Sequence, residues 1–169
     1  KALTMTRPYA LLRAGFPYDK TIGMRRVTSF PTDIALGSEG RIYVLCRTDI
    51  AADVRIINLD DESLGTIGKL GTDDGDLQWP VSIIVDSAEE LLISDEALHR
   101  VSRFNRDGEF LGKWGEQGDG DGQLNGPAGM AFDADENVYV VDSLTHRVQR
   151  FTKDGKFLLG QGGFGTGEG

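Results

Sequence analysis

The sequence predicts an all-β protein built from repeated units of four short strands. Three observations support this class: 23 glycines among 169 residues, an internal repeat of 47 residues, and no stretch of ten or more residues with helical spacing inside the repeats. The glycine share is about twice the usual ~7%. Glycine at this density indicates many turns with positive φ, and therefore many short elements instead of a few long helices.

The repeat divides the chain into a basic N-terminal segment and three units. Pro80–Asp86 corresponds to Pro127–Asp133, and the same offset of 47 residues relates the two His-Arg-Val triplets at 99–101 and 146–148. A more diverged copy opens at Pro31, with two extra residues near Asp49–Ala52. We therefore expect an N-terminal tail at 1–30 and repeats at about 31–79, 80–126 and 127–169.

Each repeat contains four short apolar runs separated by turn-forming residues. In the first repeat they are Phe30–Leu36, Arg41–Leu45, Val54–Ile57 and Gly65–Gly68; in the third they are Gly129–Phe132, Val138–Val141, Arg147–Phe151 and Phe157–Leu159. The Asp154-Gly155 pair between the last two runs is typical of a tight hairpin turn. Four antiparallel strands per unit at this period predict β-propeller blades, three per chain. A β-solenoid is the alternative, although its rungs are usually shorter.

The third repeat also resembles a known family in its residues. Gly122–Asp133, Asn137–Ser143 and His146–Phe151 together resemble the NHL repeat, and a looser likeness covers about 31–169. The resemblance implies a β-propeller, typically six-bladed, that serves as a binding platform. Gly165–Gly169 matches Gly118–Gly122, the stretch that leads into the next blade. Two interpretations stay open: the chain is a piece of a longer six-bladed parent, or two copies pair into a six-bladed ring.

The charge balance excludes some partners. The net charge is −9, which argues against a generic nucleic-acid binder and against binding to an anionic membrane. Residues 1–30 are basic, so this tail either packs across an acidic blade or acts as an arm for a partner or an anionic ligand. Lys20–Gly23 resembles Gly65–Gly68 and could complete a blade. The single cysteine, Cys46, predicts no internal disulfide and leaves the compartment open, with the cytoplasm favoured.

A polar cluster recurs in the last two repeats. It consists of Asp95, His99 and Arg100 in one, and of Asp142, His146 and Arg147 in the other. A feature that recurs in each blade is normally part of the blade, because an active site is unique. We expect the aspartate to accept a hydrogen bond from a backbone or imidazole N–H across the strand turn.

The sequence offers no catalytic residue, metal site or cofactor motif. In the propeller lyases that this chain resembles, histidines just after the blade-opening proline hold a metal; here those positions are Thr32, Val81 and Ala128, and the chain has two histidines in all. The Asp133–Asn137 stretch fails the EF-hand calcium pattern and fits turn chemistry. The alternative is a fragment of a metal-dependent propeller enzyme, lyase- or lactonase-like, whose ligands lie in missing blades.

The sequence thus predicts a non-catalytic scaffold for a protein or small-molecule ligand, with another copy of itself or missing blades as its partner. Loops that link the inner strands should rim one mouth of the channel. The candidate binding residues are Thr32, Arg47, Asp49, Val81, Glu96, Leu98, Ala128, Ser143 and Thr145. We expect Cys46 to be a small buried hydrophobe, and Trp79 and Trp114 to pack between blades.

Overall fold

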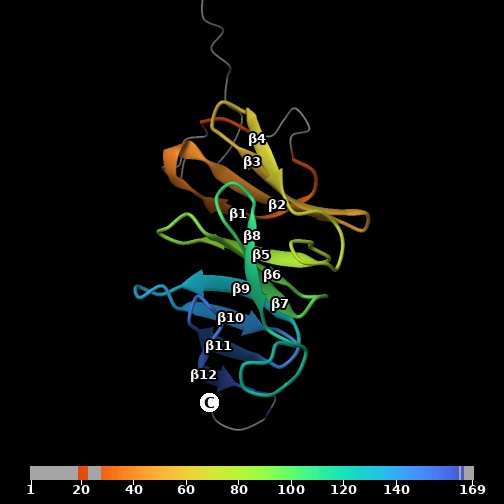
Figure 1. Ribbon diagram of the computed structural model, residues 1–169, viewed down its shortest axis with the longest axis vertical. Coiled ribbons are helices and arrows are strands. Elements are labelled where there is room, and N and C mark those ends of the chain that lie inside the picture. Colours follow the sequence, from red (N-terminus) through yellow and green to blue (C-terminus); the bar gives the residue numbers. More distant parts are fainter. Residues whose placement is uncertain (1–18, 23–27, 164, 166–169) are drawn as a thin grey trace, which may run out of the picture.

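The computed structural model describes residues 19–22, 28–163 and 165. Its strands form three four-stranded antiparallel sheets (Figure 1). Blade 1 consists of β1 (Pro31–Leu36), β2 (Ile42–Thr48), β3 (Ala51–Ile57) and β4 (Ser63–Ile67). Blade 2 consists of β5 (Pro80–Val85), β6 (Leu91–Asp95), β7 (Arg100–Phe104) and β8 (Phe110–Trp114). Blade 3 consists of β9 (Pro127–Phe132), β10 (Val138–Asp142), β11 (Arg147–Phe151) and β12 (Phe157–Gly162). The predicted all-β class is confirmed.

Each sheet is a simple meander in which every strand pairs with the next one along the chain. The first strands of the blades, β1, β5 and β9, lie side by side, so they are the inner strands of a propeller arc (Figure 1). In the described part of the chain the single helical element is a 3-10 turn, η2 (Ser38–Gly40). No helix among these residues is long and apolar enough to cross a membrane.

The strands agree with the predicted runs except at their ends. β9 begins at Pro127, two residues earlier than expected, because Pro127 pairs with Asp142 beyond a β-bulge. β12 extends to Gly162, which pairs with Arg147. The Asp-Gly turn is present: Gly155 has φ +86° and its N–H donates to the Thr152 carbonyl at 2.9 Å.

Two apolar cores lie between the blades. Alternation along β6 turns Leu91 and Ile93 toward blade 1 and Leu92 toward blade 3. One core joins Tyr43, Leu45 and Val54 of blade 1 to Ile83, Leu91, Ile93 and Phe104 of blade 2; the other joins Leu92 and Val101 of blade 2 to Val138, Val140 and Phe151 of blade 3. The segments between the outer strand of one blade and the inner strand of the next are called linkers. Each linker adds one leucine to the core between its two blades, Leu77 to the first and Leu124 to the second. We call the face of a blade toward its predecessor proximal and the other face distal.

Aromatic packing strengthens the junction of blades 2 and 3. The Trp114 ring lies 4.8 Å from the Phe151 ring, and its Nε1–H donates to the Lys153 carbonyl at 3.1 Å. The expectation that Trp114 packs between blades is therefore confirmed.

Polar contacts join the inner strands. Asp33 of β1 accepts hydrogen bonds from the Ser82 hydroxyl and the Ile83 N–H of β5, both at 2.9 Å. The Ser94 hydroxyl donates to the Ala128 carbonyl of β9 at 2.7 Å. These bonds fix the spacing of the blades where the apolar cores end.

The proximal face of blade 1, which faces none of the other described blades, has a small buried cluster of its own. Ile42, Val44, Cys46 and Ile57 are buried there, and Ile22 packs against them. Burial raises the pKa of the Cys46 thiol, an effect that a hydrogen bond with the Ser29 backbone partly offsets. Residues 19–22 form no strand, and Gly23 lies outside the described residues, so a blade-completing strand at 20–23 stays a prediction.

The linker leucine predicts a stability effect. Leu124 is fully buried, so Leu124→Ala should lower the free energy of unfolding by about 2–5 kcal/mol because it leaves a cavity between blades. Leu158→Ala removes the same atoms from an exposed position and should change it by less than about 0.5 kcal/mol. Urea unfolding followed by circular dichroism measures both values, and equal losses would contradict the packing described here.

Candidate binding surface at the loop ends

The turns β2–β3, β6–β7 and β10–β11 lie at the same end of the three blades. In each blade a residue at the end of the second strand or directly after it donates its backbone N–H to the carbonyl of the residue just before the inner strand. The three bonds are Arg47 to Phe30 (3.2 Å), Glu96 to Trp79 (3.1 Å) and Ser143 to Gly126 (2.9 Å). This shared bond holds each turn beside the opening of its own inner strand.

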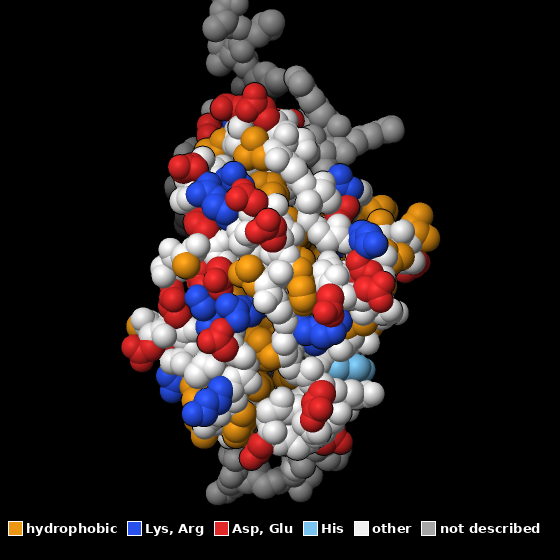
Figure 2. Space-filling view, in the orientation of Figure 1, with side chains coloured by type: hydrophobic (Ala, Val, Ile, Leu, Met, Phe, Trp, Pro, Cys, Tyr) orange, Lys and Arg blue, Asp and Glu red, His pale blue; other side chains and the backbone are white. Residues whose placement is uncertain are grey.

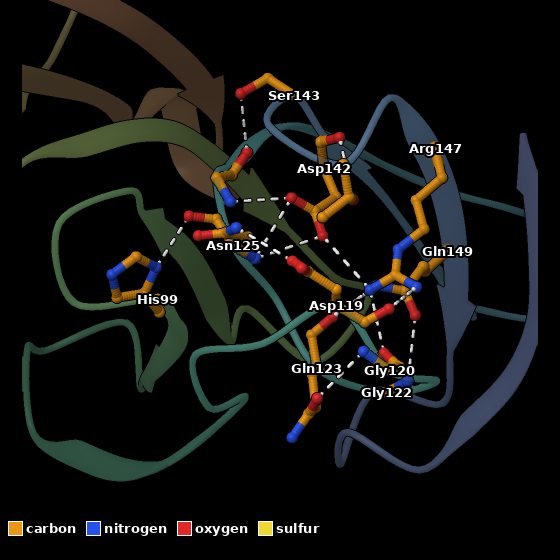
Figure 3. Close-up of polar contacts among 12 residues, drawn as sticks. His99, Asp119, Gly120, Gly122, Gln123, Asn125, Asp142, Ser143, Arg147 and Gln149 are labelled. Atoms are coloured by element: carbon orange, nitrogen blue, oxygen red, sulfur yellow. Dashed lines mark hydrogen bonds and ion pairs between the residues drawn. The ribbon is translucent and has the colours of Figure 1, made fainter. Parts of the chain in front are cut away.

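A buried aspartate anchors the turn in blades 2 and 3. Asp95 accepts the N–H groups of Gln78 at 2.7 Å, Trp79 at 3.0 Å and Leu98 at 3.1 Å. Asp142 holds the same position in blade 3 and accepts from Gly126 at 2.7 Å (Figure 3). Its carboxylate orders the end of the linker and starts the inner strand.

The arginine of each cluster binds the linker on its other side. Arg147 donates to the carbonyls of Asp119 at 2.7 Å, and of Gly120 and Gln123 at 2.9 Å (Figure 3). Arg100 does the same in blade 2, toward the carbonyls of Thr72, Asp73 and Asp76. A planar guanidinium with five donors suits this task, because it bonds several carbonyls of one loop at once.

Of the two donors expected for the aspartate, the structure has the backbone N–H, and the histidine contacts another group. His99 and His146 occupy the same turn position with φ of +52° and +56°. The Nδ1 of His99 lies 2.8 Å from the carbonyl oxygen of Asn125 in the next linker (Figure 3). The Asp95 carboxylate is bound by backbone N–H groups. The Asp and Arg residues thus attach linkers to blades in the same way in blades 2 and 3, and His99 adds a contact from its turn to the next linker.

A pocket of about 460 Å³ lies at the loop ends of blades 1 and 2, and we call it the Arg47–Trp79 pocket. It is lined by Phe30, Pro31, Thr32, Arg47, Thr48, Asp49 and Trp79. The Arg47 guanidinium stacks over the Trp79 ring, 4.1 Å from its centre, and donates to the Pro80 carbonyl at 3.1 Å. The pair combines a cation–π contact with a hydrogen bond across the blade junction.

A second pocket of about 310 Å³ adjoins the first and shares Thr48, Asp49 and Trp79 with it. The β2–β3 hairpin between them projects beyond the corresponding hairpins of the other blades (Figure 1). Ile50 at its tip is 85% exposed, and Phe30 nearby is 73% exposed. This end of the molecule therefore presents apolar side chains around a partly buried cation.

The predicted binding residues do not converge on one site. Thr32, Arg47 and Asp49 line the Arg47–Trp79 pocket, whereas Ser143 and Thr145 line two separate pockets of blade 3. Val81, Glu96, Leu98 and Ala128 line none of these four pockets.

Sequence reasoning missed the two aromatic residues of the Arg47–Trp79 pocket. Phe30 and Trp79 both stand just before the blade-opening proline, where the third repeat has Gly126. A position that only packs the repeat would carry a side chain of similar size in every copy. Two aromatic residues and a glycine at this position could therefore have indicated a role other than packing.

The Asp-rich turns use their carboxylates internally. Asp133 accepts the N–H groups of Asp135 and Asn137 at 2.9 Å and pairs with Arg150 at 2.7 Å. Desolvation would raise the pKa of Asp133, but these hydrogen bonds and the nearby Arg150 hold it below its ordinary value. Across the described ranges no three His, Cys, Asp or Glu side chains are placed to hold a metal.

Acidic and basic side chains lie interleaved on the surface. Lys153 of blade 3 reaches Asp86 of blade 2 at 2.6 Å, and the hydrogen bond to that carboxylate raises the pKa of Lys153. Arg106 pairs with Glu39 across blades 1 and 2 at 2.8 Å. In the view of Figure 2, red and blue groups accordingly stand next to each other. The negative net charge is thus not gathered into one patch on this face.

The stacked meanders with adjacent inner strands define this chain as a set of β-propeller blades. Residues 124–151 match the family model of the NHL repeat, which confirms the resemblance for the centre of blade 3. No curated protein matches the chain at a significant level of sequence similarity.

Solved structures share the fold at low sequence identity. A putative exported protein from Bacteroides fragilis is 14% identical with a TM-score of 0.63, over 89% of this chain and 41% of the other. A streptogramin B lyase is 14% identical with a TM-score of 0.58, over 78% and 40%. A catalytically inactive virginiamycin B lyase from Staphylococcus aureus with quinupristin is 16% identical with a TM-score of 0.57, over 76% and 40%. The chain spans about 40% of the length of these propellers.

The buried aspartate predicts a stability effect at the loop ends. Asp95→Asn keeps the volume but turns an amide NH₂ toward backbone N–H groups, so the free energy of unfolding should fall by about 1–3 kcal/mol. Asp74→Asn removes an exposed carboxylate that pairs with Lys113 and should cost less than about 1 kcal/mol. Chemical denaturation of both variants tests this. A similar loss in the two would show that Asp95 does not anchor the linker.

Proposed function

We propose that the chain is a non-catalytic propeller scaffold that binds a polypeptide at the loop ends of blades 1 and 2. The stacked Arg47–Trp79 pair between two adjoining pockets is the observation that carries this proposal. Tryptophan and arginine are the side chains that most often dominate binding energy at protein interfaces.

The chemistry of the pocket favours a ligand with both apolar and acceptor groups. Among the described residues Arg47 donates one side-chain hydrogen bond, to Pro80, which leaves other N–H groups of its guanidinium for a carboxylate or a peptide carbonyl. The exposed Phe30 and Ile50 offer apolar surface on either side. The Trp79 ring excludes water from one face of the Arg47 guanidinium. Interactions of this cation with a ligand are therefore stronger than those of a fully hydrated one.

The repeated frame supports a binding role for this end of the molecule. The turns are held by equivalent backbone bonds in all three blades, whereas their exposed residues differ from blade to blade. A rigid frame that carries variable loops is how repeat folds present recognition surfaces.

The likeness to lyases concerns the fold alone at 14–16% identity. The positions after the blade-opening prolines hold Thr32, Val81 and Ala128, which offer no imidazole. A metal-dependent activity would therefore need ligands from outside the residues described here, and we favour binding.

Selection of phage-displayed peptides on the immobilised full chain tests the proposal. Peptides that bind should lose at least about tenfold in affinity for Trp79→Ala or Arg47→Ala, since each change removes half of the stacked pair. Ile50→Ala, at the exposed hairpin tip, should weaken binding without any effect on folding. Isothermal titration calorimetry with the selected peptides measures the change.

Leu64→Ala and Lys113→Ala are the matched controls, because both residues are exposed on outer strands away from the loop ends. They should leave the affinity unchanged. Selected peptides that bind all three loop-end variants as tightly as the unmodified chain would refute the proposal.

We also propose that the chain self-associates through its end blades. The distal face of blade 3 exposes Tyr139 at 38% and Val148 at 39%, whereas their equivalents Leu92 and Val101 are fully buried against blade 3. A surface built like a blade junction but open to water favours burial against a further blade. Two copies related by two-fold symmetry would place six blades in a ring.

Sedimentation velocity tests self-association. The unmodified chain should sediment at twice its mass of 18.4 kDa, and Val148→Glu should return it to the monomer, because a carboxylate would be desolvated at the junction. Ile50→Glu places the same charge on another exposed apolar residue and should leave the dimer intact. A monomeric unmodified chain at micromolar concentration would refute the ring.

A further inference from the structure

A pocket of about 490 Å³ opens on the distal face of blade 3, and we call it the blade 3 pocket. It is lined by Val141, Asp142, Ser143, His146, Arg147, Val148, Gln161 and Gly162. It lies on the face that a further blade would cover. Its walls correspond one by one to residues of the two junctions inside the chain.

Both of those junctions hold a leucine from the linker at this place. Leu77 and Leu124 each stand three residues before a blade-opening proline, and both are fully buried. A Cβ placed on Gly68 would lie 2.9 Å from Leu77 Cδ1, and one on Gly115 would lie 2.8 Å from Leu124 Cδ1. The glycine at the end of each outer strand therefore makes room for the leucine.

Gly162 stands at the equivalent position of blade 3 and has the same backbone setting, but no linker leucine lies beside it among the described residues. It lies 47 residues after Gly115, and both have φ of +97°. A Cβ on Gly162 would meet the His146 carbonyl at 2.9 Å and Arg147 Cα at 3.2 Å, just as one on Gly115 would meet the His99 carbonyl at 3.0 Å and Arg100 Cα at 3.2 Å. The close leucine contact present at Gly115 is missing at Gly162 among the described residues.

Hydrogen bonds within the linker hold its leucine in place. Leu124 donates its N–H to the carbonyl of Glu116 at 2.9 Å, and Leu77 donates to that of Lys69 at 2.8 Å. Each linker thus turns back so that its leucine lies against the blade that the linker has just left. A short segment after blade 3 could therefore fill the pocket before any further blade is present.

We propose that the blade 3 pocket is a binding site for a leucine presented by a glycine-rich linker of the kind that this chain uses twice. The glycine-rich turn is needed for the backward loop, and the leucine fills the space between Val148 and Gly162. A second copy placed by ring symmetry would offer Thr28 at the equivalent position, three residues before its Pro31. Threonine is smaller and polar, so the occupant that fits is a leucine-bearing linker. This inference is independent of peptide binding at the loop ends.

An extension of the full chain tests the site. Gly165–Gly169 corresponds to Gly118–Gly122, so adding the five residues Gln-Leu-Asn-Gly-Pro, the sequence of Gln123–Pro127, places a leucine in register with Leu124. Tethering gives this leucine a high effective concentration at the pocket. The extended chain should melt about 2–4 °C above a chain extended by Gln-Asp-Asn-Gly-Pro, as expected for a modest gain in a chain of this size.

Variants of the pocket decide where the leucine binds. Val148→Asp places a charge in the pocket wall and should abolish the difference in Tm between the two extensions. Leu64→Asp places the same charge on an exposed residue of blade 1 and should preserve it. Sedimentation of each chain shows whether the leucine acts within one molecule or in a neighbour, and either result supports the site. Equal Tm values for the two extensions, or a difference that survives Val148→Asp, would overturn the proposal.

Discussion

A blade of this protein has two apolar faces and cannot bury either of them alone. Leu91, Leu92 and Ile93 are consecutive in β6 and all fully buried, although their side chains alternate between opposite faces of the sheet. This is possible because blade 2 has a neighbour on each side. The stability of one blade therefore depends on the adjacent blades, as in other repeat folds whose units contact their nearest neighbours.

The Asp, His and Arg clusters are also a consequence of the stacking of blades against one another. Stacked sheets leave a linker that must cross from the outer edge of one blade to the inner strand of the next, where its backbone groups have no strand partner. Arg147 binds three linker carbonyls and Asp142 binds linker N–H groups, so donors and acceptors are satisfied together. Their recurrence in the sequence reflects the recurrence of the linker that they bind.

The sequence predicted the strands, which depend on local signals within each repeat. It did not predict the contacts between repeats, which depend on how neighbouring blades pack. Strand positions follow from the apolar runs and from Asp-Gly turns, which are local signals. The bond between His99 and Asn125 joins residues of a turn and of the next linker, and the Arg47–Trp79 stack joins two blades. Neither can be read from spacing along the chain, because each depends on how far apart neighbouring sheets pack.

The two ends of the arc differ in a way that the repeat does not require. On the proximal face of blade 1 Ile22 packs against a buried cluster, while the distal face of blade 3 leaves Tyr139, Val141 and Val148 exposed. Each is an apolar residue at a position that faces a neighbouring blade elsewhere in the chain. A terminal repeat that ends a solenoid or arc has a polar outer face. Blade 3 lacks such a face, and the pocket beside Gly162 lies at the position that a linker leucine fills between the other blades.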